Sequence, residues 1–221
     1  MRWHLGSKQQ IAWSFALVLL RMVVFGAVLY GVLRPLLGAS DDRGSPQQIV
    51  QHGLLAVLAV VFVVVFLRRV ARTSWRELGF EAKGLGRNIG LGFATFTAGL
   101  VIVGVRLWFA DTSLSEAAAT VMSYDFEERI TAVLIGLHVV FGEEVIFRGY
   151  MQPGLAKRFG PAAGVALTAL VFAAYHVQFS APAFLGLTAW GLLWGAARQR
   201  SGSLVPSSVA HFLNWAVLGW L

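Results

Sequence analysis

Two adjacent glutamates and an arginine lie inside a stretch of the chain that is otherwise apolar. The stretch covers residues 131–155, and its charged residues are Glu143, Glu144 and Arg148. A charged side chain near the centre of a bilayer costs at least ~2.5–3.5 kcal/mol on insertion scales, so ionisable residues in a membrane segment are by default functional. The sequence therefore indicates a functional site here. A polar cluster that only holds helices together is the alternative.

The spacing of these residues predicts different roles for the two glutamates. On a helix, Glu144 and Arg148 are four apart and share a face, so we expect them to form an ion pair. Pairing offsets much of the cost of burying both charges. Glu143 is turned about 100° away, because an α-helix has 3.6 residues per turn. We therefore expect Glu143 to be the unpaired carboxylate, facing a cavity and able to act as a general base.

Two histidines and an amide follow in later apolar stretches. His176 ends the run that begins at Ala169, and His211 is followed one turn later by Asn214. By rise per residue, both histidines and Glu143 can reach the middle of a bilayer. A single histidine of this kind is more often a packing residue than a catalyst. Two histidines, an amide and a Glu-Glu-Arg cluster together indicate a site.

Three other polar residues in the apolar stretches receive structural interpretations. His138 precedes Glu143 by five residues, and we expect it to pack or to line an outer cavity. Arg21 and Arg106 are interpreted as residues near span ends, whose long side chains can extend to the membrane surface.

Composition identifies the elements that must position these residues. The chain has 221 residues, of which 57% are hydrophobic and only 13% charged, as expected of a polytopic membrane protein. No basic stripe or recognition motif accompanies the net charge of +7, which argues against nucleic-acid binding. The absence of cysteine excludes disulfides, thiolate zinc sites and cysteine nucleophiles. We expect an all-α helical bundle in the membrane.

About seven transmembrane helices are predicted from the apolar runs, each near the ~20 residues that span a bilayer. They cover residues 11–37, 48–67, 89–110, 129–155, 161–180, 182–198 and 203–221. The loops between these runs are alternately basic and either acidic or nearly uncharged. The basic residues are Arg2, Lys8, those in the loop from Arg68 to Arg87, Lys157, Arg158, Arg198 and Arg200. Such loops are cytoplasmic, so the N-terminus is predicted to be cytoplasmic. The Trp-bearing segment 73–87 is expected at the cytoplasmic interface.

Known strategies of intramembrane hydrolysis leave different sequence patterns. The zinc pattern H-E-x-x-H is absent, and Asp41, Asp42, Asp111 and Asp125 all fall in predicted loops. Ser201 and Ser203 lie in a turn at the cytoplasmic edge. The remaining chemistry is a water activated by Glu143 and His176, with His211 and Asn214 donating hydrogen bonds to the oxyanion.

Three ordered motifs resemble the CPBP family of CAAX-processing endopeptidases and bacteriocin-processing or immunity proteins, also called the Abi family. The first, E-E-x-x-x-R, starts at Glu143; the second, F-x-x-x-H, ends at His176; the third begins at His211. The resemblance is strong over residues 130–221 and rests only on helix pattern before that. The family usually has Asn or Asp four residues after the third-motif histidine. Here Trp215 occupies that position and Asn214 precedes it.

The resemblance implies a glutamate-dependent intramembrane endopeptidase. Residues 1–221 are expected to form one membrane domain with its catalytic core in residues 130–221, located in a bacterial inner membrane. Its implied partners are the lipid bilayer and a membrane-associated protein or peptide, lipidated or not. No cofactor is expected, although the residue types also permit a zinc site formed by two histidines and a glutamate. We expect the site to open toward the cytoplasmic half of the bilayer. A non-proteolytic scaffold or immunity protein of the same fold is the alternative, and a proton-relay transporter is a third possibility.

Overall fold

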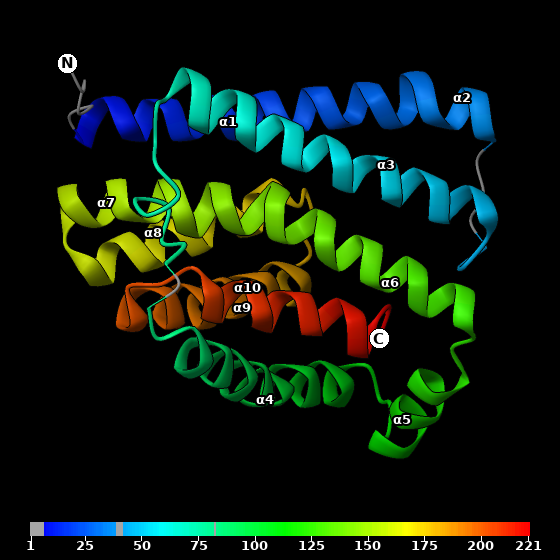
Figure 1. Cartoon of the computed structure of the whole chain (residues 1–221). Helices are drawn as coiled ribbons and strands as arrows, with labels where there is room; N and C mark the ends of the chain where they lie inside the picture. Colours follow the sequence, from blue (N-terminus) through cyan, green and yellow to red (C-terminus); the bar gives the residue numbers. More distant parts are fainter. Residues whose placement is uncertain (1–6, 39–41, 82) are drawn as a thin grey trace.

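A computed structural model of the chain describes residues 7–38, 42–81 and 83–221. Arg2 and Asp41 lie outside these ranges. The described residues form helices joined by loops, with no strand, which confirms the predicted all-α class. Figure 1 shows helices stacked in layers around one long central helix.

The described residues form eight continuous helices, several of which contain a π-helical segment. The first three are α1 (Ser7–Val28) with η1 (Leu29–Leu33) and α2 (Arg34–Leu37), α3 (Pro46–Phe62) with η2 (Val63–Val70), and α4 (Leu85–Phe109). The next three are α5 (Leu114–Ser123), α6 (Phe126–Val139) with η3 (Val140–Met151) and α7 (Gln152–Phe159), and α8 (Pro161–Tyr175). The last two are α9 (Ala181–Ser201) and α10 (Val205–Leu213) with η4 (Asn214–Leu218).

Four of these helices are long and apolar enough to cross a membrane. They are Lys8–Leu37, Pro46–Val70, Leu85–Phe109 and Phe126–Phe159, and they establish an integral membrane protein. Each of the three remaining predicted spans contains a helix, but these helices do not meet the same criteria of length and composition. The predicted number of seven is therefore not confirmed. The eighth helix, α5, lies inside a predicted loop.

Local signals account for several helix ends. Capping boxes start α5 at Ser113 and α6 at Asp125. In each, the side chain of the capping residue accepts a hydrogen bond from the backbone N–H three residues later, and the glutamate at that later position accepts one from the backbone N–H of the capping residue. Gly202 ends α9 with φ +67°, a conformation that glycine adopts without steric cost.

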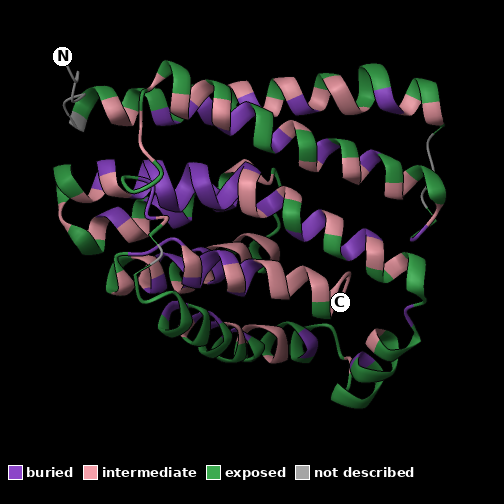
Figure 2. Cartoon of the chain, viewed as in Figure 1, coloured by how far each residue is buried: buried purple, intermediate pink, exposed green. Residues whose placement is uncertain are grey.

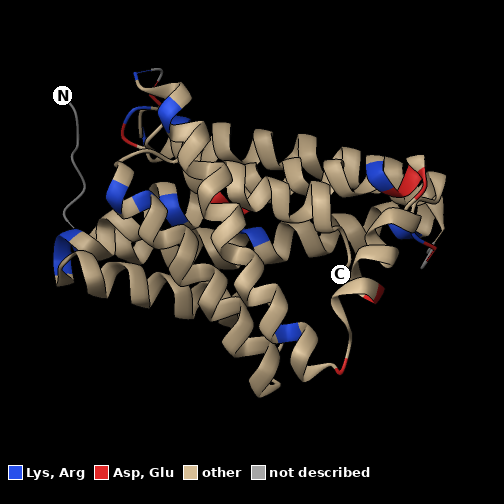
Figure 3. Ribbon diagram, turned by 90° about the horizontal axis from the view of Figure 1, so that it is seen from below, with Lys and Arg blue, Asp and Glu red and all other residues tan. Residues whose placement is uncertain are grey.

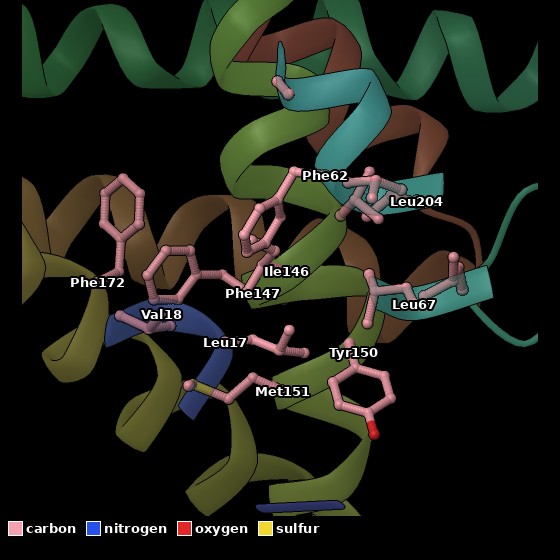
Figure 4. Close-up of a cluster of buried hydrophobic side chains, with 14 of the residues drawn as sticks. Leu17, Val18, Phe62, Leu67, Ile146, Phe147, Tyr150, Met151, Phe172 and Leu204 are labelled. Atoms are coloured by element: carbon pink, nitrogen blue, oxygen red, sulfur yellow. The ribbon is translucent and has the colours of Figure 1, made fainter. Parts of the chain in front are cut away.

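The central helix, formed by α6, η3 and α7, packs against α1 and α3 on one side and α10 on the other (Figure 1). Figure 4 shows the apolar core around η3, where Phe147 and Met151 meet Leu17 from α1. Beyond α10 lies α4, whose Gly92 and Gly99 give room to Val209 and Trp190. Small residues of this kind allow membrane helices to approach closely.

The loop between η2 and α4 folds against the start of α10. Leu78 is fully buried, and the Leu204 backbone N–H donates to the Gly79 carbonyl at 2.9 Å. Gly79 has φ +95°, and a Cβ there would lie 2.9 Å from the Leu204 nitrogen. Glycine is therefore required both by conformation and by space.

Candidate active site

Glu143 lies near the middle of the central helix, within η3, where every residue from Gly142 to Met151 is buried. Its Oε1 is 3.4 Å from Nη2 of Arg21, which comes from α1. The expectation that Glu143 has no charged partner is therefore wrong, because tertiary packing supplies one. Its other oxygen, Oε2, makes no hydrogen bond to a described residue.

Arg21 is buried at 2% exposure in the middle of α1 and does not extend to the membrane surface, contrary to the sequence interpretation. Its Nη2 is 3.1 Å from Nε2 of His138, whose ring stacks on Phe25. A Cβ at Gly142 would lie 2.8 Å from Arg21 Nη2, so the glycine beside Glu143 makes room for the guanidinium. An arginine in mid-span is itself a signal of function, and this one was available in the sequence. Arg106, by contrast, is exposed in the last turn of α4, as expected.

His176 caps the C-terminus of α8 and meets Glu143 across the bundle. Its Nε2 is 4.0 Å from Glu143 Oε2, and its side chain is 23% exposed against 7% for Glu143. Its Nδ1 is 2.8 Å from the Phe172 carbonyl, which can only accept, so Nδ1 carries the proton. In the neutral ring, Nε2 is then a free acceptor directed at Glu143.

The predicted ion pair within the first motif is present. Arg148 Nη1 lies 3.0 Å from Glu144 Oε1, and both side chains are fully buried. The Nδ1 of His211 is 3.0 Å from the same oxygen, and the His211 ring stacks on Trp194 at 3.8 Å. The Arg148 guanidinium lies 4.2 Å from the Phe172 ring centroid. Glu144 therefore joins α10 to the central helix through His211.

The side chain of Asn214 makes no hydrogen bond to Glu144, Arg148 or His211. It is half-buried at the point where α10 passes into the π-helical turn η4, and its side chain makes no hydrogen bond to a described residue. The structure thus brings Glu143 together with His176, and Glu144 together with Arg148 and His211. It does not join Asn214 to either group.

Within the described residues, no group of three His, Cys, Asp or Glu side chains is arranged to hold a metal ion. Two surface grooves of about 390 and 190 Å³ flank the C-terminal half of α9 and share Ala196 and Arg200. Neither groove is lined by Glu143 or His176, so neither belongs to this site.

Comparison with known proteins supports the resemblance read from the three motifs. Residues 126–217, which include all the site residues predicted from the sequence but not Arg21, match the family model of the type II CAAX prenyl endopeptidase Rce1-like proteins. Neither a curated protein nor a solved structure matches the chain. Over residues 126–217, which is less than half of the chain, the sequence is therefore similar to a family of CAAX prenyl endopeptidases.

Proposed function

We propose that the protein is an intramembrane endopeptidase in which Glu143 and His176 together activate a water molecule. The observation that carries this proposal is the 4.0 Å separation of His176 Nε2 and Glu143 Oε2. Both atoms are acceptors, and one water can lie about 2.8 Å from each and donate a proton to both. The water oxygen is then left free to attack a carbonyl carbon.

The hydrolysis balances with these two groups alone. The water oxygen bonds to the carbonyl carbon, and the water proton passes to the Glu143–His176 pair. Collapse of the tetrahedral intermediate breaks the C–N bond, and the same proton passes to the leaving amine nitrogen. The pair is restored for the next turnover without a further reactant.

Arg21 acts in this scheme as a positioning residue for the base. Its contact with Oε1 holds the Glu143 carboxylate so that Oε2 faces His176. A buried carboxylate without a cation is strongly unfavourable, so Arg21 also keeps Glu143 charged in its apolar surroundings.

His211 and Asn214 are proposed to stabilise the oxyanion. The Glu144 carboxylate accepts from His211 Nδ1, so the other ring nitrogen donates only when the imidazole is doubly protonated. Asn214 supplies an amide donor one residue before the usual family position.

The cellular setting proposed is a bacterial inner membrane with the N-terminus in the cytoplasm. Support comes from the gathering of Lys and Arg at the end of the bundle that carries the N-terminus (Figure 3). We propose one membrane domain over residues 1–221 with its catalytic core in 130–221. The substrate is a peptide segment of a membrane-associated protein, and a prenyl group on it follows only from the family description.

The test is peptide cleavage by the purified protein, with prenylated and unprenylated peptides offered side by side. Glu143→Gln should lower turnover by at least ~100-fold, the low end of general-base contributions. Glu127→Gln is the matched control, because Glu127 is an exposed glutamate on the same helix. Near-normal cleavage by Glu143→Gln would contradict the mechanism. A folded protein that cleaves no peptide would favour the non-proteolytic scaffold or immunity role.

A further inference from the structure

The two surface grooves beside α9 lie on either side of one strip of that helix. The α8–α9 groove is lined on α8 by Pro161, Ala162 and Val165. The α4–α9 groove is lined on α4 by Leu91, Ala94, Thr95 and Ala98. Ala196 and Arg200 of α9 line both grooves, so the two grooves are separated by a small side chain and meet at one arginine.

The wall of the α4–α9 groove is apolar and lies on a helix that can cross a membrane. The hydroxyl of Thr95 donates to the Leu91 carbonyl at 2.7 Å, so it offers no free polar group. From Leu91 to Ala98 the wall is about 10 Å long, which fits within one leaflet of a ~30 Å hydrocarbon core. Figure 2 shows α4 mostly exposed, whereas the middle of the central helix is buried. This face of α4 is therefore in contact with acyl chains.

Positive charge lies at one end of both grooves, the end of the bundle that carries the basic loops (Figure 3). Arg200 is the residue before the last of α9. Arg87, in the first turn of α4, precedes Leu91 by four residues and so shares its face. Both arginines are exposed, and neither makes an ion pair or hydrogen bond with a described residue. No Asp or Glu lines either groove.

We propose that the two grooves bind one anionic phospholipid, with an acyl chain in each groove and the phosphate at Arg200 and Arg87. Charge complementarity selects this ligand, because two guanidinium groups have no carboxylate beside them in the grooves. The fork of a guanidinium matches phosphate geometry. Basic pockets between membrane helices on the cytoplasmic side bind anionic headgroups in the same way. Ala196 is small enough to lie between the two chains.

A second copy of the chain is the other occupant that this face could take. Gly86, Gly90, Ala94 and Ala98 recur every four residues on α4, a spacing that lets membrane helices approach closely. In a two-fold dimer through this face, however, Arg87 of one copy would lie near Arg87 of the other. No carboxylate in the grooves would neutralise that repulsion, so the charge favours the lipid.

The first test counts bound lipid by native mass spectrometry of protein in detergent, with phosphatidylglycerol or phosphatidylcholine of the same chains added. One phosphatidylglycerol should bind per chain, more tightly than phosphatidylcholine, and should raise the melting temperature, since it binds the folded state. Arg87→Gln together with Arg200→Gln should weaken phosphatidylglycerol binding about 10- to 30-fold, from the loss of two basic groups near a lipid surface.

The matched control is Arg69→Gln together with Arg72→Gln. Both residues are exposed at the same end of the bundle, and neither lines a groove. Equal binding of the two lipids, or an equal loss in the control, would overturn the headgroup site. A dimer without bound lipid, dissociated by substitution in the grooves, would assign the face to a second copy instead.

The second test fills the grooves without changing the charge. Ala196→Leu should weaken phosphatidylglycerol binding, whereas Ala16→Leu, at an exposed alanine of α1, should not. Unchanged binding in Ala196→Leu would overturn the placement of the acyl chains. The melting temperature without lipid shows whether each variant folds, and if Ala196→Leu does not, the exposed arginines alone decide the outcome. Lipid binding is measured without a peptide, so the result is independent of the proposed endopeptidase function.

Discussion

Arg21 and Gly142 together set the position of the Glu143 carboxylate. We predict that Arg21→Met lowers both kcat and thermal stability, because removing one partner of a buried pair typically costs ~3–5 kcal/mol. Gly142→Ala should displace the guanidinium and keep its charge, since the new Cβ would lie 2.8 Å from Nη2. Misplacement of a catalytic group by about 1 Å can cost 10²-fold, so kcat should fall by roughly 10- to 100-fold.

The readouts for this pair are kcat in peptide cleavage and the melting temperature in detergent. Gly104→Ala is the matched control, because a Cβ at Gly104 meets nothing within 4 Å. If Gly142→Ala cleaves as fast as Gly104→Ala, the contact between Arg21 and Glu143 does not position the base.

Glu144 and Arg148 are expected to matter more for stability than Glu143 does. Their pair is fully buried at 3.0 Å, and His211 shares the same oxygen. Breaking such a pair leaves an uncompensated charge, at a typical cost of ~3–5 kcal/mol. Glu143→Gln also leaves a buried cation, Arg21, but that pair is longer, at 3.4 Å, and less completely buried. Glu144→Gln and Arg148→Met should therefore each lower the melting temperature further than Glu143→Gln. The double variant should lose less than the two losses added. Equal melting of all three single variants would show that Glu144 has no special structural role.

At the scale of elements, the third motif depends on how α10 continues. The chain enters the π-helical turn η4 at Asn214, and such turns change the register of every side chain that follows. Oxyanion donors act mainly in the transition state and are typically worth ~2.7–4 kcal/mol, which appears in kcat. We predict severe impairment in His211→Ala and a milder loss in Asn214→Ala. Trp215→Phe tests whether the indole N–H is the donor at the usual family position.

The informative comparison is kcat for Asn214→Ala, Trp215→Phe and the double variant. A loss in Asn214→Ala as large as that in His211→Ala would place the amide fully in the oxyanion site. If neither single variant nor the double variant changes kcat, the Asn214 role is wrong.

The sequence predicted the contacts that lie within one helix better than those between helices. The Glu144–Arg148 pair follows from a spacing of four residues, and it is present at 3.0 Å. The pair between Arg21 and Glu143 joins residues 122 apart, and no periodic pattern encodes which helices become neighbours. No sequence pattern indicates the π-helical η3 or the end of α8 at Tyr175, five residues before the end of the predicted span.

At the scale of the whole molecule, the distribution of charge could be predicted from the sequence, whereas the distribution of buried residues could not. Basic residues gather at one end, as the loop pattern predicted (Figure 3). The packed core at that same end depends on how α8, α9 and the loop before α4 close on the central helix, which is a tertiary property.

The three residues that could donate to a metal lie on different elements. Glu143 lies in η3, His176 at the C-terminal cap of α8, and His211 in α10. The proposed water needs no metal, because carboxylate and imidazole share its proton. We predict that cleavage survives treatment with a chelator and that active protein contains no stoichiometric metal. Reversible loss of activity, restored by zinc, would instead assign both histidines as ligands.

The central claim is that Glu143 and His176 act on one water as a unit, and a double-mutant cycle on kcat tests it most directly. Glu143→Gln and His176→Gln are measured singly and together, with Glu127→Gln as control. Groups that act as a unit give non-additive losses, so the double variant should be little slower than the worse single variant. Losses that multiply would mean that the two side chains act independently, which would contradict the account.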